Sequence, residues 1–270
     1  MLTNVPNWRT KGHIDLLLEG QMETFQTIVV PIIFISTFTR STFGFGDALI
    51  AMPLLAMAVG INVATPLVGL IAVTISITIL IKQWRNVHLK SVSMLIISTL
   101  LGIPIGILLL KGLYDNVMKL VLAVVIIIFS LYKIFKPRLF TLANDRFAYI
   151  FGLLAGILGG AYNTNGPPVV IYGSLRQWNP EKFRATLQGY FLPTGLMIAL
   201  GHGLGGLWSR QVLLDYLICL PVVFIAILLG GRLNSKIPKG KFDNCVYACL
   251  IVIGIILLIN TGASFRIDKL

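Results

Sequence analysis

Two short polar segments, each with several glycines, interrupt long apolar stretches and hold the residues whose types suit binding chemistry. The second segment contains Asn163, Thr164 and Asn165, followed by Gly166 and two prolines. Proline suits the first turn of a helix and asparagine suits the N-cap, so we predict a helix that begins near Pro167 and is capped by Asn165. The positive end of such a helix, with neutral donors beside it and a glycine permitting close approach, suits a small anion. The alternative is that these side chains only cap their own helices.

The first segment differs because it contains charged residues. Asp47 follows Gly44 and Gly46 and is placed to cap a half-helix over 48–59, while Arg40 lies seven residues earlier. An ion pair between Arg40 and Asp47 is one interpretation. The other is that Arg40 and the two glycines contact a substrate and that Asp47 takes up a coupling proton, since ionisable residues inside a membrane are functional candidates.

Two further residues, both in the apolar stretch 185–203, are weaker candidates. Gln188 is expected to point into a cavity. His202, near the outer end, is expected to be solvated, with a role in proton transfer as the alternative. The sequence contains no zinc-binding His/Glu pattern, no phosphate loop and no paired intramembrane carboxylates. No catalytic residue, metal ligand or cofactor is therefore predicted, and the protein is not expected to be an enzyme.

The composition indicates which elements must position these residues. Of the 270 residues, 56% are hydrophobic and 12% are charged, whereas roughly a quarter are charged in an ordinary soluble domain. A helix needs about 20 apolar residues to cross the hydrocarbon of a bilayer, and several charge-free runs reach that length. We therefore predict an all-α polytopic membrane protein, with full spans at 63–82, 91–110, 115–134, 185–203, 211–230 and 243–261.

The apolar regions 25–60 and 147–175 are each interrupted by one of the polar segments, so each is predicted to be a broken or re-entrant helix. Such backbone survives at membrane depth only where protein or a water-filled cavity covers it. Similar anchors recur in the same order in both halves, such as Ala-Thr at 64–65 and at 185–186. The chain is thus divided into an N-terminal segment that suits an interfacial helix, a first membrane repeat, a basic linker, a second membrane repeat and a C-terminal tail, at residues 1–24, 25–136, 137–146, 147–262 and 263–270.

The basic residues set the expected sidedness. Fourteen of the 22 Lys and Arg lie in the loops 82–90, 133–146, 173–184 and 231–241, and loops rich in these residues face the cytoplasm. The first broken helix then has both ends outside and the second has both ends inside. The halves are therefore predicted to be inverted repeats, each a broken helix plus three spans, with both chain termini outside. Transporters of this architecture bind substrate where the breaks meet. The same placement argues against a nucleic-acid surface.

Two motifs resemble those of a known family. Gly-Phe-Gly at 44–46, followed by Pro-Leu at 53–54, resembles the first-repeat glycine motif of the sulfite exporter TauE/SafE family of permeases. The glycine- and proline-rich run at 156–168, with Phe-Arg-Ala-Thr at 183–186, is similar to that family's second repeat. The resemblance covers nearly the whole chain and implies secondary transport of small anionic sulfur compounds and organic acids. The family's first motif commonly continues in glycine where this chain has Asp47, which favours unequal roles for the two breaks.

The expected function is secondary transport of a small oxyanion or organosulfonate, such as sulfite or a sulfonate, across the cell membrane. The expected partners are this anion, the lipid bilayer and a coupling ion, either a proton or sodium. An anion channel and a membrane scaffold without transport are the alternatives. The sequence patterns select neither the anion, nor the direction of transport, nor the oligomeric state.

Overall fold

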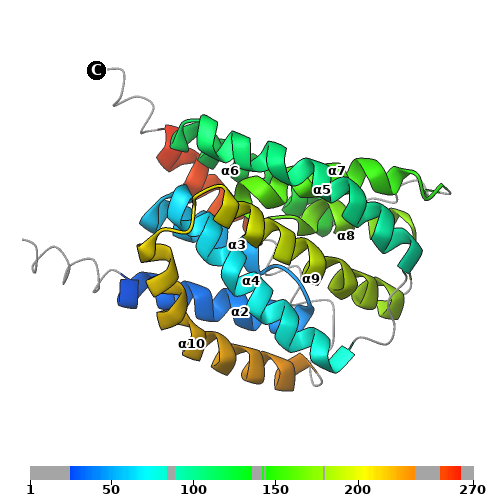
Figure 1. Ribbon diagram of the computed structural model, residues 1–270, viewed down its shortest axis with the longest axis horizontal. Coiled ribbons are helices and arrows are strands. Elements are labelled where there is room, and N and C mark those ends of the chain that lie inside the picture. The colour runs from blue at the N-terminus through cyan, green and yellow to red at the C-terminus, as the bar shows by residue number, and fades with distance from the viewer. Residues whose placement is uncertain are drawn as a thin grey trace, which may run out of the picture.

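Every regular element that the structure describes is a helix, as the sequence predicts (Figure 1). The computed structural model describes residues 25–83, 89–135, 142, 144–178, 180–234 and 250–262. The predicted interfacial helix, most of the linker, the C-terminal tail and the start of the predicted span 243–261 lie outside these residues. The elements are η1 (Phe25–Val29), α2 (Val30–Phe43), α3 (Asp47–Val59), α4 (Ile61–Gln83), α5 (Leu89–Gly112), α6 (Asp115–Phe135), α7 (Phe147–Tyr162), α8 (Gly166–Leu175), α9 (Pro180–Leu204), α10 (Arg210–Asn234) and a last helix at Leu250–Gly262.

Four of the described helices are long and apolar enough to cross a membrane. Their outward faces expose large apolar side chains such as Leu101, Ile128 and Leu228, which are unfavourable in water but match the hydrocarbon of a bilayer. The chain is therefore an integral membrane protein with several spans. The four segments coincide with four of the six predicted spans: Ile61–Ile79 in α4, Val92–Gly112 in α5, Asp115–Phe135 in α6 and Arg210–Leu233 in α10.

The long helix α9 departs from this pattern. The sequence predicts a span over 185–203, and α9 contains 25 residues, which at 1.5 Å per residue gives a length of about 37 Å. It is more polar than the four apolar spans, and Thr186, Thr194 and His202 on it are buried. The reason is its position, because one side of α9 packs against α4 and α5 in the interior of the bundle (Figure 1).

Both predicted broken helices are interrupted in the structure. α2 ends at Phe43 and α3 begins at Asp47, with Gly44 and Gly46 between them in left-handed conformations at φ 86° and 100°. A residue with a Cβ is strained at those angles and glycine is not, so the two glycines are what permits this break. The second broken helix is interrupted at 163–165, between α7 and α8.

Helices from the two halves of the chain pack against one another. α5 lies along α7, α10 lies along α2, and α4 and α9 are neighbours (Figure 1). The α5–α7 contact is so close that a Cβ on Gly102 or Gly156 would lie 2.3 Å from a backbone oxygen of the other helix, as small residues permit between membrane helices. The inverted relation of the halves and their sidedness stay predictions.

Candidate functional site

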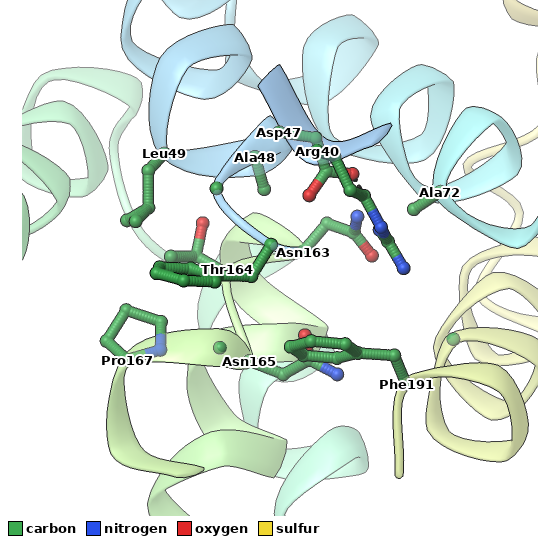
Figure 2. Close-up of a pocket in the computed structure, with 14 residues that line it drawn as sticks. Arg40, Asp47, Ala48, Leu49, Ala72, Asn163, Thr164, Asn165, Pro167 and Phe191 are labelled. Atoms are coloured by element: carbon green, nitrogen blue, oxygen red, sulfur yellow. Dashed lines mark hydrogen bonds and ion pairs between the residues drawn. The ribbon is translucent and has the colours of Figure 1, made fainter. Parts of the chain in front are cut away.

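The two breaks meet at one cavity (Figure 2). Its empty volume is about 430 Å³, counting the part that opens to solvent. Seven of the nine predicted site residues line the cavity: Arg40, Gly46, Asp47, Asn163, Thr164, Asn165 and Gly166. Of the other two, Gly44 follows the end of α2 and donates its N–H to the Arg40 carbonyl. Gln188 lies on α9, with its side chain outside the described part of the structure.

Arg40 is anchored by contacts from three helices. Its Nη1 donates to Asp47 Oδ2 at 2.7 Å and its Nη2 donates to Ser76 Oγ at 2.6 Å. Its Cζ lies 5.2 Å from the centre of the Phe191 ring, within range of a cation–π interaction. Only 5% of the Arg40 side chain and 11% of the Asp47 side chain are exposed. The structure therefore contains the ion pair, and the Arg40 Nε–H is a buried donor without a partner among the described residues.

The predicted helix cap at Asp47 is wrong. α3 begins at Asp47 itself, its N-cap is Gly46, which has no side chain, and no described side chain caps the first turn. The Asp47 carboxylate turns to Arg40 instead, because a buried guanidinium requires a charged partner. The Ile50 N–H donates to the Gly46 carbonyl at 3.3 Å, so the amides of 47–49 precede the first helical hydrogen bond and have no helical acceptor. These three residues line the cavity, and the positive end of α3 therefore faces it.

The predicted cap at Asn165 is also wrong. α8 begins at Gly166, and Asn165 before it has helical backbone angles and makes no side-chain cap bond. An N-cap side chain normally bonds the first turn from a β-type backbone, whereas Asn165 Nδ2 donates to Thr194 Oγ1 on α9 at 3.1 Å. Pro167 and Pro168 carry no N–H. The start of α8 thus offers fewer free amides than the start of α3, contrary to the expectation of an amide-rich helix end.

The turn that ends α7 uses most of its own polar groups. Asn163 is left-handed at φ 52°, a conformation that asparagine tolerates, and its N–H donates to the Gly159 carbonyl at 2.8 Å. Thr164 Oγ1 donates to the Tyr162 carbonyl at 3.0 Å, so this hydroxyl serves its own turn. Among the described residues the Asn163 side-chain amide forms no hydrogen bond, and it lies at the cavity wall (Figure 2).

The expectation that His202 is solvated is wrong. The residue is fully buried, and its Nε2 donates to the Gly160 carbonyl at 2.8 Å, one of the last carbonyls of α7, which have no helical donor. Its Nδ1 lies beside Gly69 on α4, where a Cβ would be 3.3 Å from that nitrogen and 3.6 Å from Asn163 Oδ1. Gly69 therefore leaves room for the imidazole and the amide together. The glycines on each side of His202 pack elsewhere, Gly201 against Ile107 and Gly203 against Trp208.

Sequence reasoning missed the side chains of α4 and α9 that support the site. Ser76 bonds Arg40, Thr194 bonds Asn165, and the ring of Phe191 lies beside the guanidinium and lines the cavity. All three lie inside predicted spans, where a single serine, threonine or phenylalanine is indistinguishable from an ordinary packing residue. No signal in one sequence selects them.

Comparison with known proteins shows the family. The family model described as sulfite exporter TauE/SafE matches residues 29–257. A probable sulfite/organosulfonate exporter TauE of Cupriavidus necator is 26% identical over 230 residues, which cover 83% of this chain and 90% of that protein. No solved structure matches the chain. The family match includes both breaks, and the predicted resemblance to this family is confirmed. The chain belongs to the sulfite exporter TauE/SafE family, whose members are membrane exporters and not enzymes.

Proposed function

We propose that this protein is a secondary transporter that binds a small oxyanion or organosulfonate between its two helix breaks and carries it across the cell membrane. The observation that carries the proposal is that Arg40, the first turn of α3 and the neutral break before α8 line one cavity. Membership of an exporter family supports transport, and the name of the Cupriavidus relative, which refers to sulfite and organosulfonates, supports the substrate class.

The cavity can hold an anion without a lysine. A helix N-terminus carries about half a positive charge, and the uncapped first turn of α3 brings that charge to the cavity. Arg40 adds a full charge and an unused Nε–H donor. Such attractions are stronger in a low-dielectric interior than in water. Because Asp47 already neutralises Arg40, an entering anion competes with a carboxylate for the same guanidinium.

The rest of the lining suits a compact anion with a short carbon group. The Asn163 amide and the backbone N–H of Gly166 are neutral donors, and the rings of Phe45 and Phe191 are apolar. In this arrangement the oxygens of a sulfonate meet the donors while its carbon atoms meet the rings. Gln188, on the same helix as Phe191, is proposed as a further neutral ligand.

A thermal-shift screen of the purified protein tests binding. The compounds are sulfite, sulfate, thiosulfate, taurine, sulfoacetate and simple carboxylates. We expect a sulfur oxyanion or a sulfonate to raise the unfolding temperature, because a ligand at 100 times its Kd stabilises the folded state by about 2.7 kcal/mol. If none of these compounds shifts the unfolding temperature, the protein is better described as a scaffold.

Transport is measured separately, in proteoliposomes. A secondary transporter shows saturable counterflow, in which unlabelled anion inside the vesicle drives uptake of labelled anion from outside. A channel shows ionic current that needs no driving ion, and such a current would replace the transporter proposal.

The proposal includes two inverted repeats with the basic loops in the cytoplasm. The packing between the halves supports it, because the same pairing recurs in both directions: α5 of the first half lies along α7, and its counterpart α10 of the second half lies along α2. Single cysteines introduced at Gln83, Asn144 and Asn234 should be labelled from the cytoplasm, and one at Asn116 only from outside, as the charge distribution predicts. Labelling of the Gln83 and Asn116 positions from the same side would contradict the inversion.

A further inference from the structure

The two partners of the buried ion pair are held very differently. Arg40 has fixed contacts besides Asp47, because its guanidinium bonds Ser76 on α4 and lies over the ring of Phe191 on α9. These contacts hold the positive charge of Arg40 against α4 and α9, inside the bundle. Ser76 and Phe191 therefore still hold the guanidinium in place when another anion replaces Asp47 as its charged partner.

Asp47 lacks such additional anchors. Among the described residues its carboxylate bonds only Arg40, and its backbone follows the two left-handed glycines Gly44 and Gly46. A Cβ on Gly46 would meet nothing closer than Thr39 Cγ2 at 4.0 Å, so the turn is loosely surrounded. The carboxylate is thus the partner that can leave, by rotation of its own side chain and movement of the glycine turn.

The charges in the cavity add a second constraint. Arg40 and Asp47 are the two charged residues among the described side chains that line it, and together they are neutral. A monoanion that entered without a compensating charge would leave the buried site with a net negative charge, which a low-dielectric interior strongly disfavours. One proton on Asp47 removes this cost, because Arg40 and the anion then form the neutral pair.

No other described titratable group lies on this face of Asp47. α2 contributes Arg40, α4 contributes the neutral Ser76, and the second break contributes neutral amides and a hydroxyl. On α6, which also packs against α3, the Asp115–Lys119 ion pair lies at the far end, where Asp115 accepts the N–H of Ile61. The imidazole of His202 is packed behind the Asn163 amide, beside α4.

We propose that the substrate anion and one proton bind together, the anion replacing the Asp47 carboxylate at Arg40 while Asp47 takes up the proton from solvent. This inference rests on the proposed transport function and identifies its coupling ion as a proton. The hydrogen bond from Arg40 Nη1 to Asp47 breaks and one to the anion forms, with the unused Nε–H as a second donor. The empty and the loaded cavity then carry the same charge, so transport is electroneutral for a monoanion.

The test uses labelled methanesulfonate in proteoliposomes. This sulfonate is the anion of a strong acid and keeps a single negative charge throughout the pH range used, so any pH dependence belongs to the protein. A pH gradient of one unit, acid outside, is expected to sustain about a tenfold accumulation, with one proton entering per methanesulfonate. Clamping the membrane potential with potassium and valinomycin should leave the accumulation unchanged.

Variants assign the proton to Asp47. Asp47→Asn mimics the protonated state permanently, so methanesulfonate exchange should persist while accumulation driven by the pH gradient falls to the level of empty vesicles. Asp47→Glu retains a titratable group and should retain accumulation, which keeps the test decisive if the asparagine variant fails to fold. Asp145→Asn is the matched control, because Asp145 forms an Arg–Asp pair of the same 2.7 Å length away from the cavity, and it should behave as wild type.

Two results would overturn the inference: uptake by the wild type that follows the membrane potential and ignores pH, or undiminished pH-driven accumulation by Asp47→Asn. A wild type that neither binds nor exchanges methanesulfonate or any compound of the thermal-shift screen contradicts the proposed function instead. The two failures are therefore distinguishable.

Discussion

The two helix breaks line the same cavity with different chemistry. The first contains an ion pair, Arg40 with Asp47, and an uncapped helix start whose amides face the cavity. The second contains neutral polar side chains, and its helix begins at Gly166 followed by two prolines. The proposed anion site is therefore built from unequal halves, in which the first break supplies the charge and the second supplies a neutral wall.

The difference follows from how each helix end is satisfied. At the second break, His202 donates to the Gly160 carbonyl at 2.8 Å and Thr65 Oγ1 donates to the Ala161 carbonyl at 3.4 Å. The last carbonyl of α7 accepts a hydrogen bond from within the turn itself. These carbonyls are acceptors, so the end of α7 attracts no anion, and Pro167 and Pro168 remove two amides from the start of α8. The start of α3, in contrast, keeps its first amides for the cavity.

Removing the charge of the first break should have the largest effect. Arg40→Gln leaves the Asp47 carboxylate buried without its partner, so we expect a loss of about 3–5 kcal/mol in the free energy of unfolding, together with loss of anion binding. The double variant Arg40→Gln/Asp47→Asn should recover most of the stability and none of the binding. Thermal unfolding and the anion thermal shift measure both quantities.

The partly exposed Arg176–Asp145 pair is the control for that prediction. Its side chains are 21% and 25% exposed, so Asp145→Asn should cost about 1 kcal/mol or less. Normal anion binding by Arg40→Gln would show that the charge of the first break is not part of the site.

A bulky residue at the start of α8 should abolish binding with little change in stability. At Gly166 a Cβ would lie 3.6 Å from Phe191 Cζ, an ordinary contact, so Gly166→Ala should fold and bind within about threefold of wild type. Gly166→Val adds an isopropyl group to a site that faces the cavity, so its anion thermal shift should disappear. A normal shift in the valine variant would move the anion away from the second break.

The stability of the C-terminal end of α7 should depend on the N–H that His202 donates to the Gly160 carbonyl, and not on the charge of the imidazole. His202→Phe keeps an aromatic ring but leaves the Gly160 carbonyl without a donor, which costs about 1–3 kcal/mol. His202→Gln supplies an N–H and should restore most of that stability, as measured by thermal unfolding. Equal destabilisation by both variants would mean that ring packing, and not the hydrogen bond, holds this end.

The smallest effects are expected at the two asparagines of the second break, where Asn163 should affect anion affinity and Asn165 should affect stability. Asn163→Gly keeps the left-handed turn and removes an amide that has no hydrogen bond among the described residues, so anion affinity should fall about tenfold, the value of one hydrogen bond. Asn165→Ala loses the bond to Thr194 and should cost about 1 kcal/mol of stability while changing affinity less than threefold. A reversed pattern, measured by anion titration and thermal unfolding, would exchange the roles of these residues.

The sequence predicted the class of fold and the position of both breaks for clear physical reasons. Charge-free runs of about 20 residues require hydrocarbon, and Gly44 with Gly46 marks a backbone that other residues do not adopt easily. The Arg40–Asp47 ion pair was also one of the predicted arrangements, because two opposite charges seven residues apart in an apolar region are best buried as a pair.

The individual roles at the site were harder to predict because they depend on contacts between distant helices. Asn165 is a good N-cap by propensity, yet an acceptor 29 residues away on α9 takes its side chain. His202 resembles a solvated histidine near a helix end, and only the approach of α7 makes it a donor to a helix carbonyl. At both residues a hydrogen bond to a distant helix determines the role of the side chain, and local propensity does not.

The position of the bound anion decides whether the first break supplies the charge of the site. In crystals grown with selenite, an analogue of sulfite whose selenium scatters anomalously, we expect one strong anomalous peak in the cavity between the breaks. Its oxygens should lie about 2.7–3.2 Å from the first amides of α3 and from the Arg40 guanidinium, with the Asp47 carboxylate displaced from Arg40. A peak outside the cavity, or one at the start of α8 with the Arg40–Asp47 pair intact, would show that the first break does not bind the anion.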